Sequence, residues 1–178
     1  MPDCFDTLIA LLRWDRSPTA NRPLITGLRA CRLPGTSHTE QGITVSLSRE
    51  NSEDIAFFNT DSASFRSPLQ LSHEKACDLL VVVMNTRTAR LLFVEMTSGD
   101  FSKCEDQLES VIKTLHQAST ATAWQELRQR TALIVASASV PRGRKSKTKF
   151  FQEQYGVILE IKSGIKKSKT LSLRPYCR

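Results

Sequence analysis

The feature that most constrains the fold is an unbroken apolar run from Leu79 to Met84, which is followed by a polar turn and a second apolar segment. A strand that is apolar at every position has both faces buried, so its sheet needs packed layers on both sides. Residues 85–88 are polar, and residues 90–95 return as a second strand, which predicts a hairpin. The run is far shorter than the ~20 apolar residues of a membrane-spanning helix, so we expect no membrane partner.

Elements of both types surround this hairpin. Residues 4–13 and 103–117 carry apolar residues at helical spacing, and Ser102 and Glu105 have the spacing of a capping box. Residues 15–42 are interrupted by Pro and Gly, and we expect loops there with one short strand. The other expected elements are strands over 43–48, 55–58, 132–136 and 157–161, and short helices over 123–130 and 150–155. This order predicts an α/β fold with a mixed central sheet flanked by helices.

The chain length suits one domain with a short extension. We assign residues 1–161 of the 178 to a single domain and residues 162–178 to a basic C-terminal tail. Five scattered cysteines include no C-x-x-C pair, which is typical of reduced thiols, and the chain starts with acids rather than with the basic residues of a secretory signal. A cytoplasmic protein is the expectation.

Charge is segregated along the chain. Residues 1–120 hold 12 Lys and Arg against 15 Asp and Glu, whereas residues 121–178 hold 13 against 3. A separate basic region favours a polyanionic partner such as nucleic acid, although a solvated surface is the alternative. The candidate nucleic-acid-binding residues are Arg142, Arg144, Lys145, Lys147, Lys149, Lys166 and Lys167. Beside them, Phe150, Phe151 and Tyr155 either stack on bases or, as we favour, anchor a short helix in the core.

Two acids flank the predicted hairpin. If its turn is centred on residues 86 and 87, Asp78 lies directly opposite Glu95 on one face of the sheet, with Cβ atoms ~5 Å apart. Two adjacent carboxylates raise each other's pKa, and a hard cation such as Mg²⁺ or Mn²⁺ would relieve the repulsion. Such a metal can activate water and stabilise charge on a phosphate. The alternative is that both acids are merely solvated at the sheet edge; in either case we do not expect them in the hydrophobic core.

These residues carry a resemblance to a known superfamily. Residues 77–82 (CDLLVV) and 93–97 (FVEMT), with Gln107 on the next helix, resemble the core of the PD-(D/E)xK nucleases, which include restriction endonucleases and Holliday-junction resolvases. The resemblance covers residues 76–137, and the helix at 4–13 by order only. It implies a restriction-endonuclease-like αβββαβ core in which Asp78 and Glu95 bind Mg²⁺.

The sequence departs from the motif at one position. The superfamily's lysine, two residues after the second acid, corresponds here to Thr97, which has no charge and is a poor base. Three interpretations follow: the enzyme tolerates the change, a displaced lysine replaces it, or the site is degenerate. Lys103 is the nearest candidate for a catalytic substitute, and Lys75 is a weaker one.

The sequence therefore leaves three functions open. The first is a metal-dependent nuclease, or a nuclease-derived subunit, that acts on DNA or RNA. The second is a catalytically inactive nuclease-like domain that binds nucleic acid or a partner protein in a larger assembly, where another subunit supplies specificity. The third is a basic RNA-binding protein unrelated to nucleases.

Overall fold

A computed structural model describes residues 4–50, 52–71, 76–85, 88–99, 101, 103–139, 147–166 and 169–177. The helices are α1 (Cys4–Leu11), α2 (Pro18–Ala30), α3 (Ala63–Arg66), α4 (Cys104–Ala118), α5 (Ala121–Glu126) and α6 (Thr148–Tyr155), with 3₁₀ turns η1 (Trp14–Arg16) and η3 (Arg174–Cys177). The strands are β1 (Arg32–Leu33), β2 (Ser37–Glu40), β3 (Ile43–Ser46), β4 (Asp54–Asn59), β5 (Leu79–Met84), β6 (Ala89–Thr97), β7 (Gln129–Ala136), β8 (Ile158–Lys162) and β9 (Thr170–Ser172).

The strands form two sheets. The larger sheet has six strands in the order β1-β4-β5-β6-β7-β8, and the smaller has three in the order β2-β3-β9. In the larger sheet the pairs β1–β4, β4–β5 and β5–β6 are antiparallel, whereas the pairs β6–β7 and β7–β8 are parallel. The predicted mixed sheet flanked by helices is confirmed.

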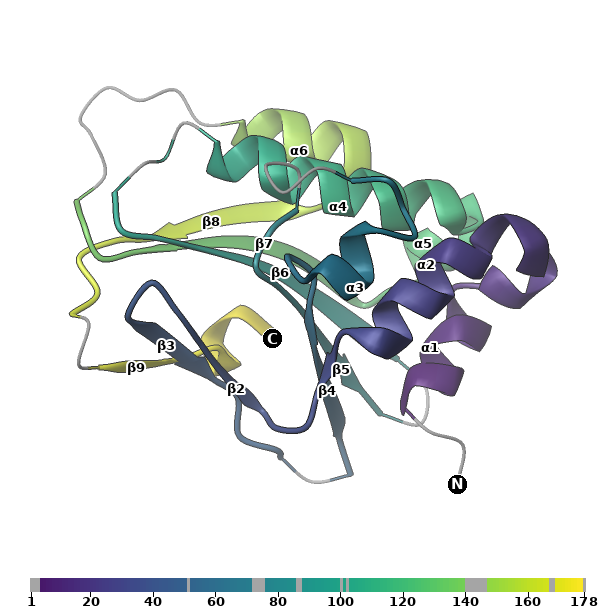
Figure 1. The fold of residues 1–178 in the computed structure, drawn as a ribbon, viewed down its shortest axis with the longest axis horizontal. Helices are drawn as coiled ribbons and strands as arrows, with labels where there is room; N and C mark the ends of the chain where they lie inside the picture. Colours follow the sequence, from purple (N-terminus) through teal and green to yellow (C-terminus); the bar gives the residue numbers. More distant parts are fainter. Residues whose placement is uncertain are drawn as a thin grey trace.

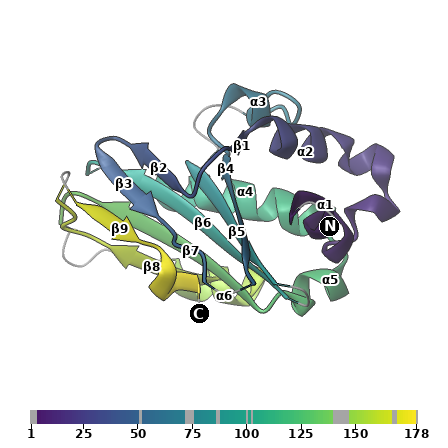
Figure 2. The same ribbon diagram turned by 90° about the horizontal axis from the view of Figure 1, so that it is seen from below.

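The larger sheet lies between two layers. Helices cover one face, and the small sheet lies against the other (Figure 1; Figure 2). Val81 and Val94 belong to a core shared with Ile43 and Val45 of the small sheet, and all four side chains are almost fully buried. Every residue of β5 is buried, so this strand has packed layers on both faces, as its continuous apolar run predicts.

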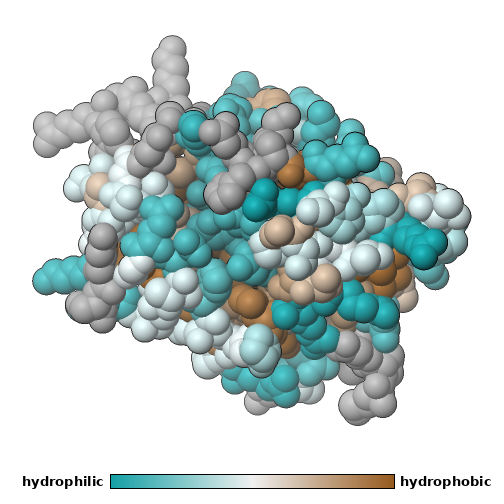
Figure 3. Space-filling model, viewed as in Figure 1, coloured by the Kyte–Doolittle hydropathy of each residue, from teal (hydrophilic) through white to brown (hydrophobic). Residues whose placement is uncertain are grey.

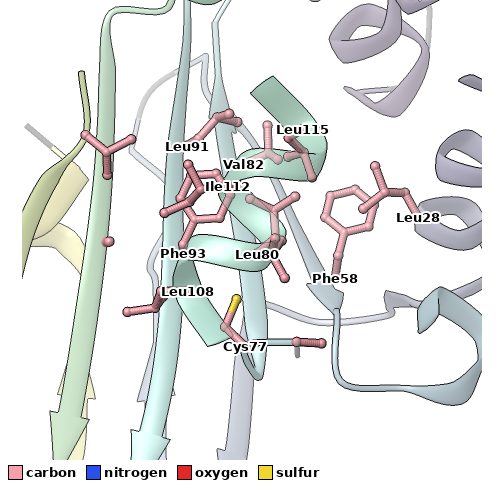
Figure 4. Close-up of a cluster of buried hydrophobic side chains, with 14 of the residues drawn as sticks. Leu28, Phe58, Cys77, Leu80, Val82, Leu91, Phe93, Leu108, Ile112 and Leu115 are labelled. Carbon is pink, nitrogen blue, oxygen red and sulfur yellow. The ribbon is translucent and has the colours of Figure 1, made fainter. Parts of the chain in front are cut away.

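The helix-side core is centred on α4. Phe93 and Leu80 from the sheet pack with Leu108, Ile112 and Leu115 of this helix, and Figure 4 shows them interleaved. The apolar residues of α4 recur at helical spacing, so one face of the helix is buried and the other is polar. The helix predicted over 103–117 is thus confirmed with its bounds moved by one residue, while Ser102 of the expected capping box lies outside the described residues.

The N-terminal region differs from its prediction. The segment 15–42, expected to be loops with one strand, contains the 13-residue helix α2 as well as β1 and β2. Pro18 is at the start of α2, where a missing N–H costs nothing, but Pro23 and Gly27 lie inside it. Burial of Leu24 and Leu28 outweighs the low helix propensity of those two residues. At Gly27 a Cβ atom would lie 3.0 Å from the carbonyl oxygen of Phe65, so α2 and α3 approach closely there.

The C-terminal segment also differs from the expected tail. Strand β9 pairs in parallel with β3, and the amide of Leu173 donates to the carbonyl of Ser46 at 2.8 Å. Arg174 Nη1 lies 2.8 Å from Glu53 Oε2, and Arg90 Nη1 lies 3.1 Å from Glu53 Oε1. Hydropathy did not indicate this because β9 has only three residues and its contacts are with residues early in the chain.

The surface shown in Figure 3 is mostly hydrophilic, with apolar residues in small separate patches. Among the described residues, none of the helices has both the length and the apolar character needed to cross a membrane.

Candidate active site

Asp78 and Glu95 lie where the hairpin register places them. Leu79 pairs with Val94 across β5 and β6, so Asp78, one residue earlier, lies opposite Glu95. Residues directly opposite on antiparallel strands project from the same face, and alternation puts both acids on the side of Leu80 and Phe93, towards the helices. The predicted pairing of the two acids is confirmed.

Main-chain amides hold both carboxylates. The amide of Asp78 donates to Glu95 Oε2 at 3.2 Å, and the amide of Met96 donates to Asp78 Oδ2 at 2.6 Å. Each acid is therefore fixed by the backbone of the opposite strand. Asp78 is 6% exposed and Glu95 4% exposed. The expectation that both acids lie outside the core is wrong, because other segments cover this end of the hairpin: the Thr60 amide donates to the carbonyl of Asp78, and Gln107 of α4 donates to that of Ala76.

Burial makes both acids harder to ionise. It raises the pKa of the Asp78 carboxyl, which the hydrogen bond from the Met96 amide lowers in part. Burial likewise raises the pKa of Glu95, and the charge of Asp78 raises it further. Glu40 and Asp61 add to the rise at both acids. Within the described residues, the charged groups that perturb this pair are thus themselves acidic.

Glu40 and Asp61 come from separate segments that meet at this end of the sheet. Glu40 is the last residue of β2, and Gln41 in the β2–β3 turn accepts a hydrogen bond from the amide of Ser98 at 2.9 Å. Asp61 follows Thr60, whose amide donates to the carbonyl of Asp78 at 3.1 Å. Sequence analysis missed both acids because no spacing relates them to the hairpin; only the tertiary fold brings them near it.

A cation also lies beside this acidic group. Arg66 Nε is 3.4 Å from Asp61 Oδ1 and donates to the carbonyl oxygen of Asp61 at 2.6 Å. The Arg66 side chain is 17% exposed, so this ion pair is largely shielded from water. Arg66 is therefore directed to Asp61, whose carboxylate still adds to the rise in the pKa of Asp78 and of Glu95.

The position at which the resemblance would place a lysine holds a buried hydroxyl. Thr97 is on the same face as Glu95 and is 5% exposed, and its Oγ1 accepts a hydrogen bond from the amide of Gly99 at 3.2 Å. Lys103 is exposed and immediately precedes α4. Lys75, the weaker candidate, lies outside the described residues.

Gln107 ties the helix layer to this site. Its Nε2 donates to the carbonyl oxygen of Ala76 at 3.3 Å, two residues before Asp78. The contact joins α4 to the segment immediately before β5. Gln107 therefore positions the backbone that carries the first acid.

Two carboxylates are available for a cation here. Among the described residues, no three Asp, Glu, His or Cys side chains gather into a group that could hold a metal ion. Mg²⁺ binds readily through one or two carboxylates while keeping several waters, so the pair Asp78 and Glu95 fits it chemically. A divalent cation would also offset the charge of the two carboxylates, whose pKa values are raised chiefly by burial.

The seven basic residues that the sequence analysis assigned to nucleic-acid binding fall into three groups: one that is paired with acids, two that are exposed, and four that lie outside the described residues. Lys147 Nζ lies 2.6 Å from Asp106 and 3.1 Å from Glu109 of α4, so its charge is balanced within the protein. Lys149 and Lys166 are exposed. Arg142, Arg144, Lys145 and Lys167 lie outside the described residues.

The aromatic residues of α6 mainly serve packing. Phe151 is fully buried, and the Tyr155 ring lies 5.6 Å from that of His116 on α4. Phe150 is 38% exposed, with its ring centroid 5.8 Å from Lys147 Nζ. This agrees with the favoured interpretation that the segment anchors a short helix in the core.

No family model matches this chain, and no curated protein or solved structure shows significant similarity to it. Its function is therefore inferred from the site itself.

Proposed function

We propose that the protein is a PD-(D/E)xK-like, metal-dependent nuclease, or a subunit derived from one, with Asp78 and Glu95 as the ligands of Mg²⁺ or Mn²⁺. The observation that carries this proposal is the buried pair of facing carboxylates at the end of the β5–β6 hairpin. A purely structural role explains this arrangement poorly, since two neighbouring buried acids destabilise a fold unless a proton or a cation offsets their charge.

The residues of the chain suggest how such a site would act. Asp78 and Glu95 would hold the cation rigidly, because each is fixed by an amide of the opposite strand. When bound, a divalent cation supplies a water of lowered pKa and stabilises negative charge on a phosphate. Thr97 can orient a water by hydrogen bonding but brings no charge, so we expect slower cleavage than a lysine would support.

The substrate we propose is nucleic acid, DNA or RNA. Its support is the basic character of residues 121–178, where exposed Lys149 and Lys166 add to the basic run at 142–145. Contacts to phosphates give affinity without reading sequence. We therefore propose that another subunit supplies specificity, in a cytoplasmic setting.

Thr97 favours a second candidate function. A nuclease fold that has lost its lysine can persist as a domain that binds nucleic acid, or a partner protein, in an assembly. The buried Thr97 hydroxyl, bonded to the Gly99 amide, is as compatible with this function as with weak catalysis.

A cleavage assay separates the two. Single-stranded and duplex DNA and RNA are incubated with Mg²⁺ or Mn²⁺ and the wild type, Asp78→Asn or Glu95→Gln. The amide side chains of Asn and Gln keep the shape of the carboxylates and one acceptor oxygen, so both variants should fold. They lack the negative charge that would bind the cation, so both should lose activity. Asp54→Asn, which changes an exposed carboxylate on β4, is the matched control and should keep it.

Thr97→Lys tests the missing charge. If the wild-type site is only weakened, this variant should cleave faster, with thermal unfolding checked in parallel because position 97 is buried. Absence of metal-dependent cleavage by both the wild type and a folded Thr97→Lys variant would reject the enzyme and leave the binding domain.

A further inference from the structure

The two edges of the larger sheet differ in their protection. Strand β1 forms one edge, has only two residues and is followed by Pro34, which has no amide hydrogen to donate. Strand β8 forms the other edge, with five residues and no proline, and among the described residues it pairs only with β7 (Figure 2). Proteins usually shorten or cover such edges, because unpaired backbone groups attract another strand.

The side chains of β8 also suit a partner strand. Leu159 is buried on the helix side, and Ile161 packs against the same core. Ile158, Glu160 and Lys162 alternate with them and are exposed. Ile158 is 46% exposed and, with Phe150, is one of two large apolar side chains exposed in the described part of the chain. Phe150 packs towards Tyr155 of α6 and towards Lys147, which immediately precedes the helix, so Ile158 is the apolar side chain that belongs to the edge.

Charge selects the partner and the register. We propose that β8 pairs antiparallel with β8 of a second copy of this chain, across a twofold axis at Ile161. This register sets Glu160 of each copy opposite Lys162 of the other, and the twofold axis makes the pair occur twice. A register centred on Glu160 would instead oppose two Glu160 side chains, which destabilises a strand pair.

The apolar contact at Ile161 fits the same register, whereas Ile158 would lie opposite Gly164 of the other copy. Ile161 would face its own counterpart on the helix side of the sheet, and the two sheets would join into one continuous sheet of twelve strands, twice the six of a single copy. Direct cross-strand neighbours of this kind have Cα atoms ~4.5–5.5 Å apart. The proposed surface lies on the opposite side of β7 from the hairpin that carries Asp78 and Glu95, and it does not depend on their activity.

Sedimentation velocity over a range of concentrations tests the pairing through charge reversal. The wild type should reach twice the 20.0 kDa mass of one chain. Glu160→Lys and Lys162→Glu should each raise the dimer dissociation constant about tenfold, since two attractive pairs become repulsive, and the double variant should restore it. Lys113→Glu, an equal charge change on the exposed face of α4, should leave it unchanged. A wild type that stays monomeric, or single variants that dimerise as it does, would overturn the proposal.

Cross-linking tests the register. Ile161→Cys should give a covalent dimer under mild oxidation, because the two thiols face each other across the axis. Ile158→Cys should not, because this register places residue 158 opposite residue 164. Efficient cross-linking through position 158 and none through 161 would reject the proposed register.

Discussion

Asp78 and Glu95 are coupled through the backbone as well as through charge: the amide of Asp78 donates to Glu95 Oε2 at 3.2 Å. The carboxylate of Asp78 in turn accepts a hydrogen bond from the Met96 amide at 2.6 Å. The two acids are thus fixed in place before any cation binds. This preorganisation suits ligand binding, since little side-chain freedom remains to be lost.

The metal-free protein should lose stability as the pH rises. Burial raises the pKa of both acids, so the folded state holds their protons more tightly than the unfolded chain, whose carboxyls titrate near about 4. The stability that the two raised pKa values contribute is fully present below that pH, and it is lost as the pH rises through the raised values. Urea unfolding in a chelator at about pH 6 and about pH 9 measures this loss. Glu95→Gln should flatten it, Asp54→Asn should not, and equal slopes in all three proteins would contradict the prediction.

A divalent cation should reverse that loss. We expect Mn²⁺ to raise the thermal midpoint of the wild type near neutral pH and to release protons on binding, because its ligands must be ionised. Calorimetry in buffers of different ionisation enthalpy measures the proton release. Asp78→Asn should abolish both effects. A wild-type midpoint that does not respond to Mn²⁺ would count against the metal site.

Gly27→Ala should destabilise the protein despite the better helix propensity of alanine. The new Cβ would lie 3.0 Å from the carbonyl oxygen of Phe65, so α2 and α3 would have to separate. We expect a loss of about 1–2 kcal/mol in the free energy of unfolding, measured in urea. Gly35→Ala is the control, because its Cβ would meet no atom within 4 Å. A stabilised Gly27→Ala variant would show that the helices can move apart freely.

Glu53→Ala should be among the most destabilising changes of a charged residue. Glu53 pairs with both Arg90 and Arg174, and these three side chains are 13–14% exposed. Removing Glu53 leaves the two shielded guanidinium groups without the carboxylate that they share, at a cost of about 3 kcal/mol in the free energy of unfolding. Glu50, whose side chain is 61% exposed, also lies near Arg174, and Glu50→Ala should cost far less. Similar losses for the two variants would argue against a buried network.

Lys147 should matter less for nucleic-acid affinity than its neighbours. Its ammonium group is already paired with Asp106 and Glu109, so few counterions are released when a phosphate approaches it. We expect Lys147→Ala to leave the salt dependence of binding nearly unchanged, and Arg142→Ala with Arg144→Ala to reduce it by about two phosphate contacts. Fluorescence anisotropy at several salt concentrations measures both slopes, and a larger effect of Lys147→Ala would mean that it exchanges its partners for phosphate.

Sequence alone predicted the elements whose patterns are local. The run from Leu79 to Met84 fixed a strand buried on both faces, and the turn length then fixed the register that pairs Asp78 with Glu95. The spacing of Leu108 and Ile112 likewise located α4. Each of these conclusions depends on residues close together in the chain.

The remaining features depend on contacts between distant segments. Helix α2 exists because its apolar face is buried, even though Pro23 and Gly27 oppose helix formation locally. The burial of Asp78 and Glu95, and the approach of Glu40 and Asp61, follow from how the layers stack. No pattern within a few residues encodes such proximity.

The pairing of β9 with β3 has a consequence for the order of events during synthesis. Thr44 pairs with Thr170, so the small sheet cannot close until the chain has been translated as far as β9. The β2–β3 turn, which contacts Ser98 near the acidic pair, would then gain its last support only at that stage. A nascent chain would therefore carry both carboxylates on a formed hairpin before β9 emerges, and their surroundings would be completed last.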